Sequence, residues 1–139
     1  MSTLTAYTAL KTWFDTTWLL TARVFENESP YPPPGSAGEL PPFVHMAVRG
    51  EAFRQISIGS LSNLKRERGR AIFTCCVATG AGAEEPRSMA VTLAAQMKGL
   101  VLAPSGLRCE DMRIGFGEAF SDAGNYWGVP LITDWILDS

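Results

Sequence analysis

Apolar residues recur at helical spacing in two parts of the chain. The first apolar face predicts an amphipathic helix over residues 3 to about 20, and its members are Leu4, Tyr7, Leu10, Phe14 and Trp18. The second predicts a helix over about 85–99, with Pro86 at a favoured first-turn position. Its members are Met89, Ala90, Leu93, Ala94, Met97 and Leu100.

Alternating apolar and polar positions predict the strands. We expect a short strand over 22–25, then a hairpin whose arms are 43–49 and 53–58 and whose turn is Gly50-Glu51. Residues 71–78 are apolar on both faces, which is typical of a central strand, and residues 59–65 read as a polar connection before it. Strands over 107–120 and 126–137 would pair through a turn at 122–125. Pro130 indicates an edge or bulged position for the last strand.

A proline-rich stretch over about 26–42 separates the first strand from the hairpin. It carries six prolines together with Gly35 and Gly38, so it cannot continue a helix or a ladder and is expected to be a long loop. The element order predicts one domain over residues 1–139 of the α+β class. Its mostly antiparallel sheet would carry the N-terminal helix and a second helix on one face.

Composition and charge limit the kinds of partner that the chain is expected to bind. Charged residues make up 19% of the chain, below the roughly 25% of ordinary soluble domains, so a partner is expected to cover part of the surface. The formal net charge is -2 and the basic residues form no block beyond Lys65–Arg70, which argues against tight DNA binding. No apolar run approaches the roughly 20 residues of a membrane helix, and no signal-peptide pattern opens the chain.

The residues offer little for catalysis, cofactors or metals. Gly80-Ala81-Gly82 follows a strand, but the third glycine of a dinucleotide fingerprint would fall at Glu85, and no phosphate-binding Gly-Lys-Ser/Thr occurs. His45 is the one histidine, and a lone strand histidine is usually structural. Cys75 and Cys76 would point to opposite faces of a strand, and the cysteines lack zinc-ligand spacing. We expect no catalytic, cofactor or metal site.

Two features indicate contacts with other subunits. The basic cluster Lys65–Arg70 is either a solvated lead-in to a strand or part of a contact, since arginine is favoured at interfaces. The terminal hairpin holds more aromatic area than one edge strand easily hides. The candidate contact residues are Tyr31, Phe43, His45, Arg66, Arg68, Arg70, Tyr126, Trp127 and Trp135.

The order of the segments resembles that of a known family. An amphipathic helix leads to Ala22-Arg23-Val24-Phe25-Glu26-Asn27 and a proline-rich loop, then to a strand over 42–48. Arg66-Glu67-Arg68-Gly69 runs into the strand 72–77, and a Gly/Ala-rich turn, a helix and the strand 127–133 follow. In this pattern, nearly the whole chain resembles the tail terminator (tail completion) proteins of long-tailed bacteriophages. The pair Cys75-Cys76 and the insertion around 30–42 depart from it.

The resemblance implies a structural virion protein without catalytic residues or cofactors. It implies a homo-oligomeric ring, usually a hexamer, that is assembled in the host bacterial cytoplasm, ends the tail tube and joins it to the head connector. Its partners would be its own copies, the tail tube protein and a connector or neck protein, with DNA passing through without specific binding and no membrane involved. Two alternatives stay open: a head-completion or neck ring protein, and a small enzyme or ligand-binding domain with a pocket beneath the proline-rich loop.

Overall fold

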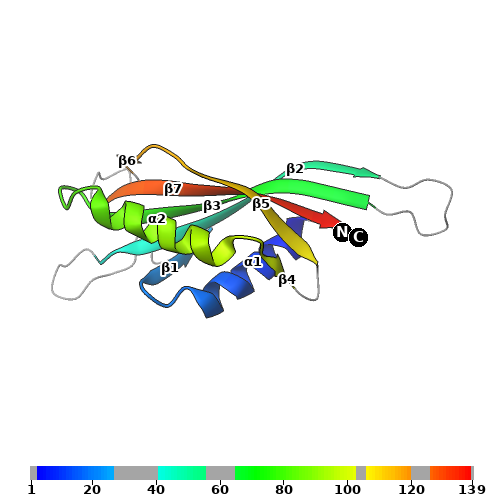
Figure 1. Cartoon of the computed structure of the whole chain (residues 1–139), viewed down its shortest axis with the longest axis horizontal. Helices are drawn as coiled ribbons and strands as arrows, with labels where there is room; N and C mark the ends of the chain where they lie inside the picture. The colour runs from blue at the N-terminus through cyan, green and yellow to red at the C-terminus, as the bar shows by residue number, and fades with distance from the viewer. Residues whose placement is uncertain (1–2, 27–40, 56–64, 103–105, 120–125, 139) are drawn as a thin grey trace.

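Two helices cover one side of a single β-sheet (Figure 1). The computed structural model describes residues 3–26, 41–55, 65–102, 106–119 and 126–138. Four predicted features lie outside these ranges: the candidate contact residue Tyr31, most of the proline-rich stretch, the expected turn at 122–125, and the expected connection at 59–65 except Lys65, which begins a strand. Helix α1 spans Thr3–Thr17 and helix α2 spans Glu84–Met97, close to the predicted bounds.

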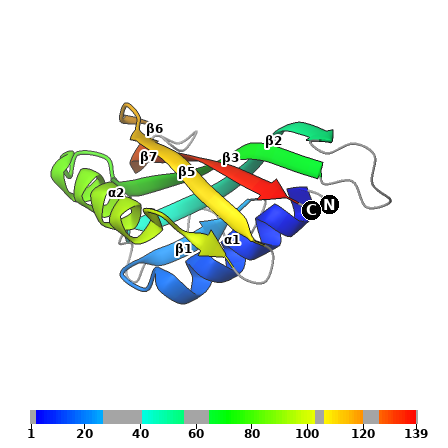
Figure 2. The same ribbon diagram turned by 45° about the vertical axis from the view of Figure 1, so that its right-hand side comes forward.

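Within the described residues, seven strands form the sheet in the order β1-β2-β3-β7-β5-β4, and β6 pairs with β7 (Figure 2). The bounds are β1 Ala22–Phe25, β2 Phe43–Gln55, β3 Lys65–Ala78, β4 Val101–Leu102, β5 Leu107–Ile114, β6 Glu118–Ala119 and β7 Tyr126–Asp138. The pair β1 and β2 is parallel, and the other pairings are antiparallel. The predicted α+β class with a mostly antiparallel sheet is therefore confirmed.

Strand β3 is the central strand that the sequence predicts. One edge of β3 pairs with β2 from Lys65 to Cys76, and the other edge pairs with β7 from Arg66 to Ala78. Alternate residues of β3 face the helices, among them Phe73 and Cys75, both fully buried. Cys76 belongs to a separate cluster on the opposite side, so the adjacent cysteines do point to different faces.

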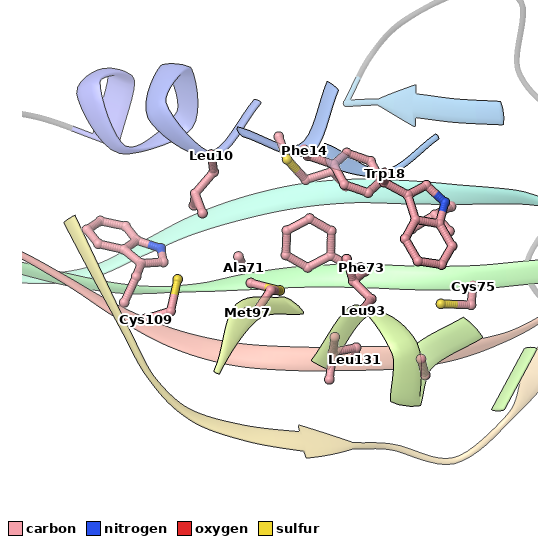
Figure 3. Packing of buried hydrophobic residues seen from close by; sticks show 14 of the residues in the cluster. Leu10, Phe14, Trp18, Ala71, Phe73, Cys75, Leu93, Met97, Cys109 and Leu131 are labelled. Carbon is pink, nitrogen blue, oxygen red and sulfur yellow. The ribbon is translucent and has the colours of Figure 1, made fainter. Parts of the chain in front are cut away.

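The core fills the space between the helices and the sheet (Figure 3). Phe14 of α1 is its centre, with edge-to-face contacts to Phe73 of β3 at 5.1 Å and to Phe25 of β1 at 5.9 Å between ring centroids. Aromatic pairs in this geometry add stability beyond the burial of their area. Leu93 and Met97 bring α2 onto the same core. The apolar faces predicted from the spacing are thus the buried faces of both helices, with one exception: Leu4 at the start of α1 is 70% exposed.

Polar contacts with β1 hold the end of α1. The Arg23 guanidinium donates from Nη1 to the Trp18 carbonyl oxygen at 2.6 Å and from Nε to Asp15 Oδ1 at 2.9 Å. The Trp18 indole donates to Thr21 Oγ1 at 2.8 Å. Helix carbonyls left without intrahelical donors need such partners, and here the following strand supplies one. The helix ends at Thr17 rather than at the predicted residue 20.

The predicted hairpin with its turn at Gly50-Glu51 is wrong. The chain continues through these residues as one strand, β2, and the ladder with β3 shifts register between Gly50 and Ala52. A bulge adds one residue to a strand without reversing it, and a glycine suits a bulge as well as it suits a turn. The partner of β2 is β3 rather than residues 53–58.

Pro130 indicated an edge or bulged position for the last strand, but β7 lies between β3 and the pair β5 and β6, and its ladder with β3 runs through Pro130 without a shift of register. The Pro130 carbonyl oxygen accepts a hydrogen bond from Gly115 N at 2.9 Å. The N–H and C=O of one strand residue point to the same neighbour, so the missing N–H of Pro130 faces the break between β5 and β6. A proline is tolerated in this interior strand because no neighbouring strand needs a backbone N–H at that position.

The basic segment before residue 71 belongs to β3 and is not a lead-in to it. Gly69 lies opposite Trp135 of β7, and a Cβ at this position would come within 2.4 Å of the Trp135 ring and 2.0 Å of the Arg49 carbonyl oxygen. The indole ring therefore packs directly on the backbone of β3. Only glycine leaves room for it.

We predict that Gly69→Ala destabilises the fold by about 2 kcal/mol, because the added methyl group overpacks the contact with Trp135 and Arg49. Urea unfolding followed by circular dichroism measures the free energy of unfolding. The matched control is Gly80→Ala, which has open space around its Cβ and only a positive φ to strain. Gly80→Ala is expected to lower the free energy of unfolding by about 1 kcal/mol. Equal losses in the two variants would contradict the packing argument.

Candidate functional site: the open face of the sheet

The side of the sheet opposite to the helices is the main candidate for function, and we call it the open face. Within the described ranges, no helix covers it. Residues of β3 and β7 that alternate with the core residues form its centre, and they include Ile72, Thr74, Pro130 and Ile132. All four are half-buried. These four residues give the open face an apolar centre against which neither helix packs.

A hollow of about 270 Å³ lies in this centre. Its lining residues are Ile72, Thr74, Glu118, Gly128, Pro130 and Ile132. The lining is mostly apolar, with one exposed carboxylate and one hydroxyl, and it contains no nucleophile paired with a base. The hollow is therefore suited to holding an apolar group.

One end of the open face is closed by a small aromatic cluster. Phe43 and Tyr126 meet edge to face at 4.8 Å, together with Val24 and Cys76. The Tyr126 hydroxyl donates to the Pro41 carbonyl oxygen at 3.2 Å. Phe43 and Tyr126 are fully buried, so the prediction that they carry contacts needs correction: their rings already fill the interior of one chain.

The other end of the open face carries arginines paired with carboxylates. Arg66 binds Asp138 through two hydrogen bonds, from Nε at 2.8 Å and from Nη2 at 3.0 Å. Such bidentate pairs are the strongest kind of ion pair. The hydrogen bond from Arg66 holds the pKa of Asp138 below its usual value, and nearby Arg108 acts in the same direction.

A second carboxylate bridge continues this charged end. Arg70 Nε lies 2.9 Å from Glu51 Oε1 and 3.5 Å from Asp134 Oδ1. The other carboxylate oxygen of Asp134, Oδ2, lies 3.5 Å from Arg113 Nη1. Arg68 is exposed beside them, opposite Ile136 in the register of β3 and β7. Arginines and carboxylates therefore alternate at this end of the face, and Glu110 adds a further carboxylate that acts on Arg66.

The remaining predicted contact residues are spread over the molecule. Trp135 is fully buried among the core residues beneath the helices, so it cannot reach a partner in this fold and that prediction also needs correction. Trp127 is half-buried, and its ring lies against Gly117. His45 is half-buried on the open face. The structure therefore brings Arg66, Arg68 and Arg70 together in one row and leaves the aromatic residues apart from it.

Sequence reasoning missed the most exposed large apolar side chain in the described residues. Phe116 is 93% exposed and lies between β5 and β6. The predicted strand over 107–120 included Phe116 as an ordinary strand residue, but β5 ends at Ile114. The signal that could have found it is the flanking pair Gly115 and Gly117, because glycines on both sides of an aromatic residue indicate an interrupted strand.

The three cysteine thiols are buried, and burial favours their protonated form. Burial raises the pKa of the Cys75 thiol to about 12 and of the Cys109 thiol to about 11, and it raises the pKa of Cys76 as well. Among the described residues, no group of three or more potential ligands could hold a metal ion. No helix in the same ranges is long and apolar enough to span a membrane.

Comparisons with known proteins establish the fold and no family. No family model matches the chain, and neither does any curated protein. One similar solved structure, whose name gives no function, has a TM-score of 0.63 and 18% sequence identity. The match covers 99% of this chain and 96% of that chain. The arrangement of helices and strands therefore exists in another protein of nearly the same length.

We predict that the three native thiols react slowly with a thiol reagent such as DTNB at neutral pH. Cys75 and Cys76 are fully buried, Cys109 is nearly so, and their raised pKa values keep them protonated. The absorbance of released thionitrobenzoate follows the reaction, and denaturant should make all three thiols react quickly. Fast reaction of one thiol in the folded protein would show an opening that the packing does not contain.

We predict that stability falls as the pH drops below the ordinary histidine value. Burial lowers the pKa of His45, and Glu26 opposes this only in part, so the unfolded chain binds a proton more readily than the folded one. The loss begins as the pH falls through 6.5, the unfolded value, and ends below the folded pKa. Thermal unfolding between about pH 7.5 and about pH 5.5 measures it. In His45→Gln this part of the pH dependence should disappear, and an unchanged profile would contradict the assignment.

Proposed function

We propose that the chain is a structural subunit of a bacteriophage tail, forming a homo-oligomeric ring that ends the tail tube and joins it to the head connector. The single observation that carries the proposal is the open face. It combines a half-buried apolar centre with a row of arginines. Such a face suits recognition of another protein surface. The order of segments, which resembles that of tail terminator proteins, supports the same function.

The charges of the open face give the proposal a direction. The exposed guanidinium of Arg68 favours a partner surface that carries a carboxylate at the matching position, which orients the two surfaces as they approach. Arg66 and Arg70 are held by Asp138, Glu51 and Asp134, whereas Arg68 is exposed and reaches outward. Arg68 is therefore the arginine most free to meet such a partner.

The hollow favours one other function, binding of a small apolar ligand. Its volume of about 270 Å³ is just below the range of about 300–1,000 Å³ that is usual for ligand pockets. Its lining offers few polar groups to fix the orientation of a ligand. We therefore place this function second.

We predict that the purified chain joins the ends of tail tubes and forms rings there, which negative-stain images of the chain mixed with tail tube protein would reveal. Arg68→Glu should weaken this joining about tenfold, because it reverses a charge on the open face. Arg87→Glu is the matched control, since Arg87 is an exposed residue of α2 on the helix side.

A chain that never joins a tube end in either form would overturn the proposal. Rings located between head and connector in intact particles would instead assign the chain to head completion or the neck. Equal losses in Arg68→Glu and Arg87→Glu would show that joining does not use the open face.

A further inference from the structure

Glu118 differs from the paired carboxylates of the open face. Asp138 is held by Arg66, and Asp134 lies beside Arg70 and Arg113. Within the residues that the structure describes, no lysine or arginine forms an ion pair with Glu118, and its side chain is exposed. The negative charge of Glu118 is therefore left for a group from another molecule.

This unpaired carboxylate belongs to the wall of the hollow. Strand β6 pairs with β7 at Gly128, which places Glu118 beside the hollow, and its side chain lines the hollow together with Ile72, Pro130 and Ile132. An apolar cavity of about 150 Å³ binds benzene, and this hollow measures about 270 Å³, so it has room for an aliphatic chain. The hollow thus offers an apolar floor with one negative charge at its wall.

A lysine side chain has the matching chemistry. Its four methylene groups can lie against apolar walls while its ammonium group stays at the water boundary. The ammonium carries three donors, and the lining supplies acceptors in the Glu118 carboxylate and the Thr74 hydroxyl. Lysine fits this hollow better than arginine, because its stem is longer and its charged group is compact, whereas a guanidinium needs space for a planar fork.

The hollow suits a side chain that a protein surface delivers better than it suits a free amine. Only one carboxylate and one hydroxyl could orient a free ligand, and small-molecule sites usually bury most of the ligand. A side chain is already oriented by the surface that carries it. That surface can also reach Arg68, which lies opposite Ile136, about 26 Å along β7 from Gly128. Opposite charges at the two ends of the open face would fix the direction of such a partner.

We propose that the open face binds a partner protein that inserts a lysine side chain into the hollow, with its stem against Ile72, Pro130 and Ile132 and its ammonium group beside Glu118. An exposed ion pair adds little affinity by itself. The lysine therefore acts mainly through the position and direction that it gives to the partner. The proposal does not rest on the tail function, because the isolated chain can show the binding.

Two short peptides that differ at one position test the proposal: acetyl-Gly-Lys-Gly-amide and its counterpart with norleucine, which has an uncharged side chain in place of the lysine. The isotope-labelled chain is titrated with each peptide, and the backbone amide signals of Thr74, Gly128 and Ile132 are followed by NMR. The lysine peptide should shift these signals and bind about fivefold more tightly than the norleucine peptide. Equal binding of the two peptides, or no shift with either, overturns the proposal.

Two variants locate the charge that makes the difference. Glu118→Gln should bind both peptides equally, whereas the matched control Glu84→Gln should keep the preference for lysine, because Glu84 is an exposed carboxylate of α2 on the helix side. A preference that survives in Glu118→Gln would contradict the assignment to this carboxylate.

Other occupants of the hollow give different results in the same spectra. If free hexylammonium shifts these amide signals and the lysine peptide does not, the hollow is a site for small amines and the docking of a protein side chain fails. Tighter binding of the corresponding arginine peptide would overturn the choice of lysine. Shifts of the same signals on raising the concentration of the chain alone would assign the hollow to a second copy and overturn the proposal.

Discussion

The pairing of β3 with β7 is the interaction on which the rest of the structure depends. It runs from Arg66 opposite Asp138 to Ala78 opposite Tyr126, and it joins segments far apart in the chain. On one side of this ladder, alternate residues form the floor on which α1 and α2 pack. On the other side, the intervening residues form the hollow and the row of arginines. The register of this pairing therefore decides which residues belong to the core and which to the open face. A shift of one residue would move each set of side chains to the other face.

Long periodic segments of this fold could be predicted from the sequence, because burial imposes a spacing on them. The helix faces led by Leu10 and Phe14 and by Leu93 and Met97 are buried as the spacing indicates. The two-sided apolar strand around Phe73 is central, and the terminal hairpin of β5 and β7 forms. In each case the same apolar residues define both the local period and the tertiary contact.

The errors arose where a local signal has more than one structural solution. Glycine at position 50 suits a turn or a bulge, and only the long ladder with β3 selects the bulge. Proline at position 130 indicates an edge strand only if a neighbouring strand needs a backbone N–H from this residue. The missing N–H faces the break between β5 and β6, where no strand residue needs it. The burial of Trp135 depends on the absence of a side chain at Gly69, on a different strand. The arginine row could be found from the sequence, whereas its carboxylate partners come from distant segments.

The parallel pairing of β1 with β2 sets a lower limit on the length of the segment that connects them. Phe25 ends β1 beside Met46, whereas Phe43, where β2 begins, lies beside Ala22 at the other end of the pair. The chain must therefore travel back along the whole paired length before it can enter β2 in the same direction, which a tight turn cannot achieve. Shortening the proline-rich stretch to a few residues would cost the sheet its first strand and, with it, the Arg23 anchor that holds the end of α1.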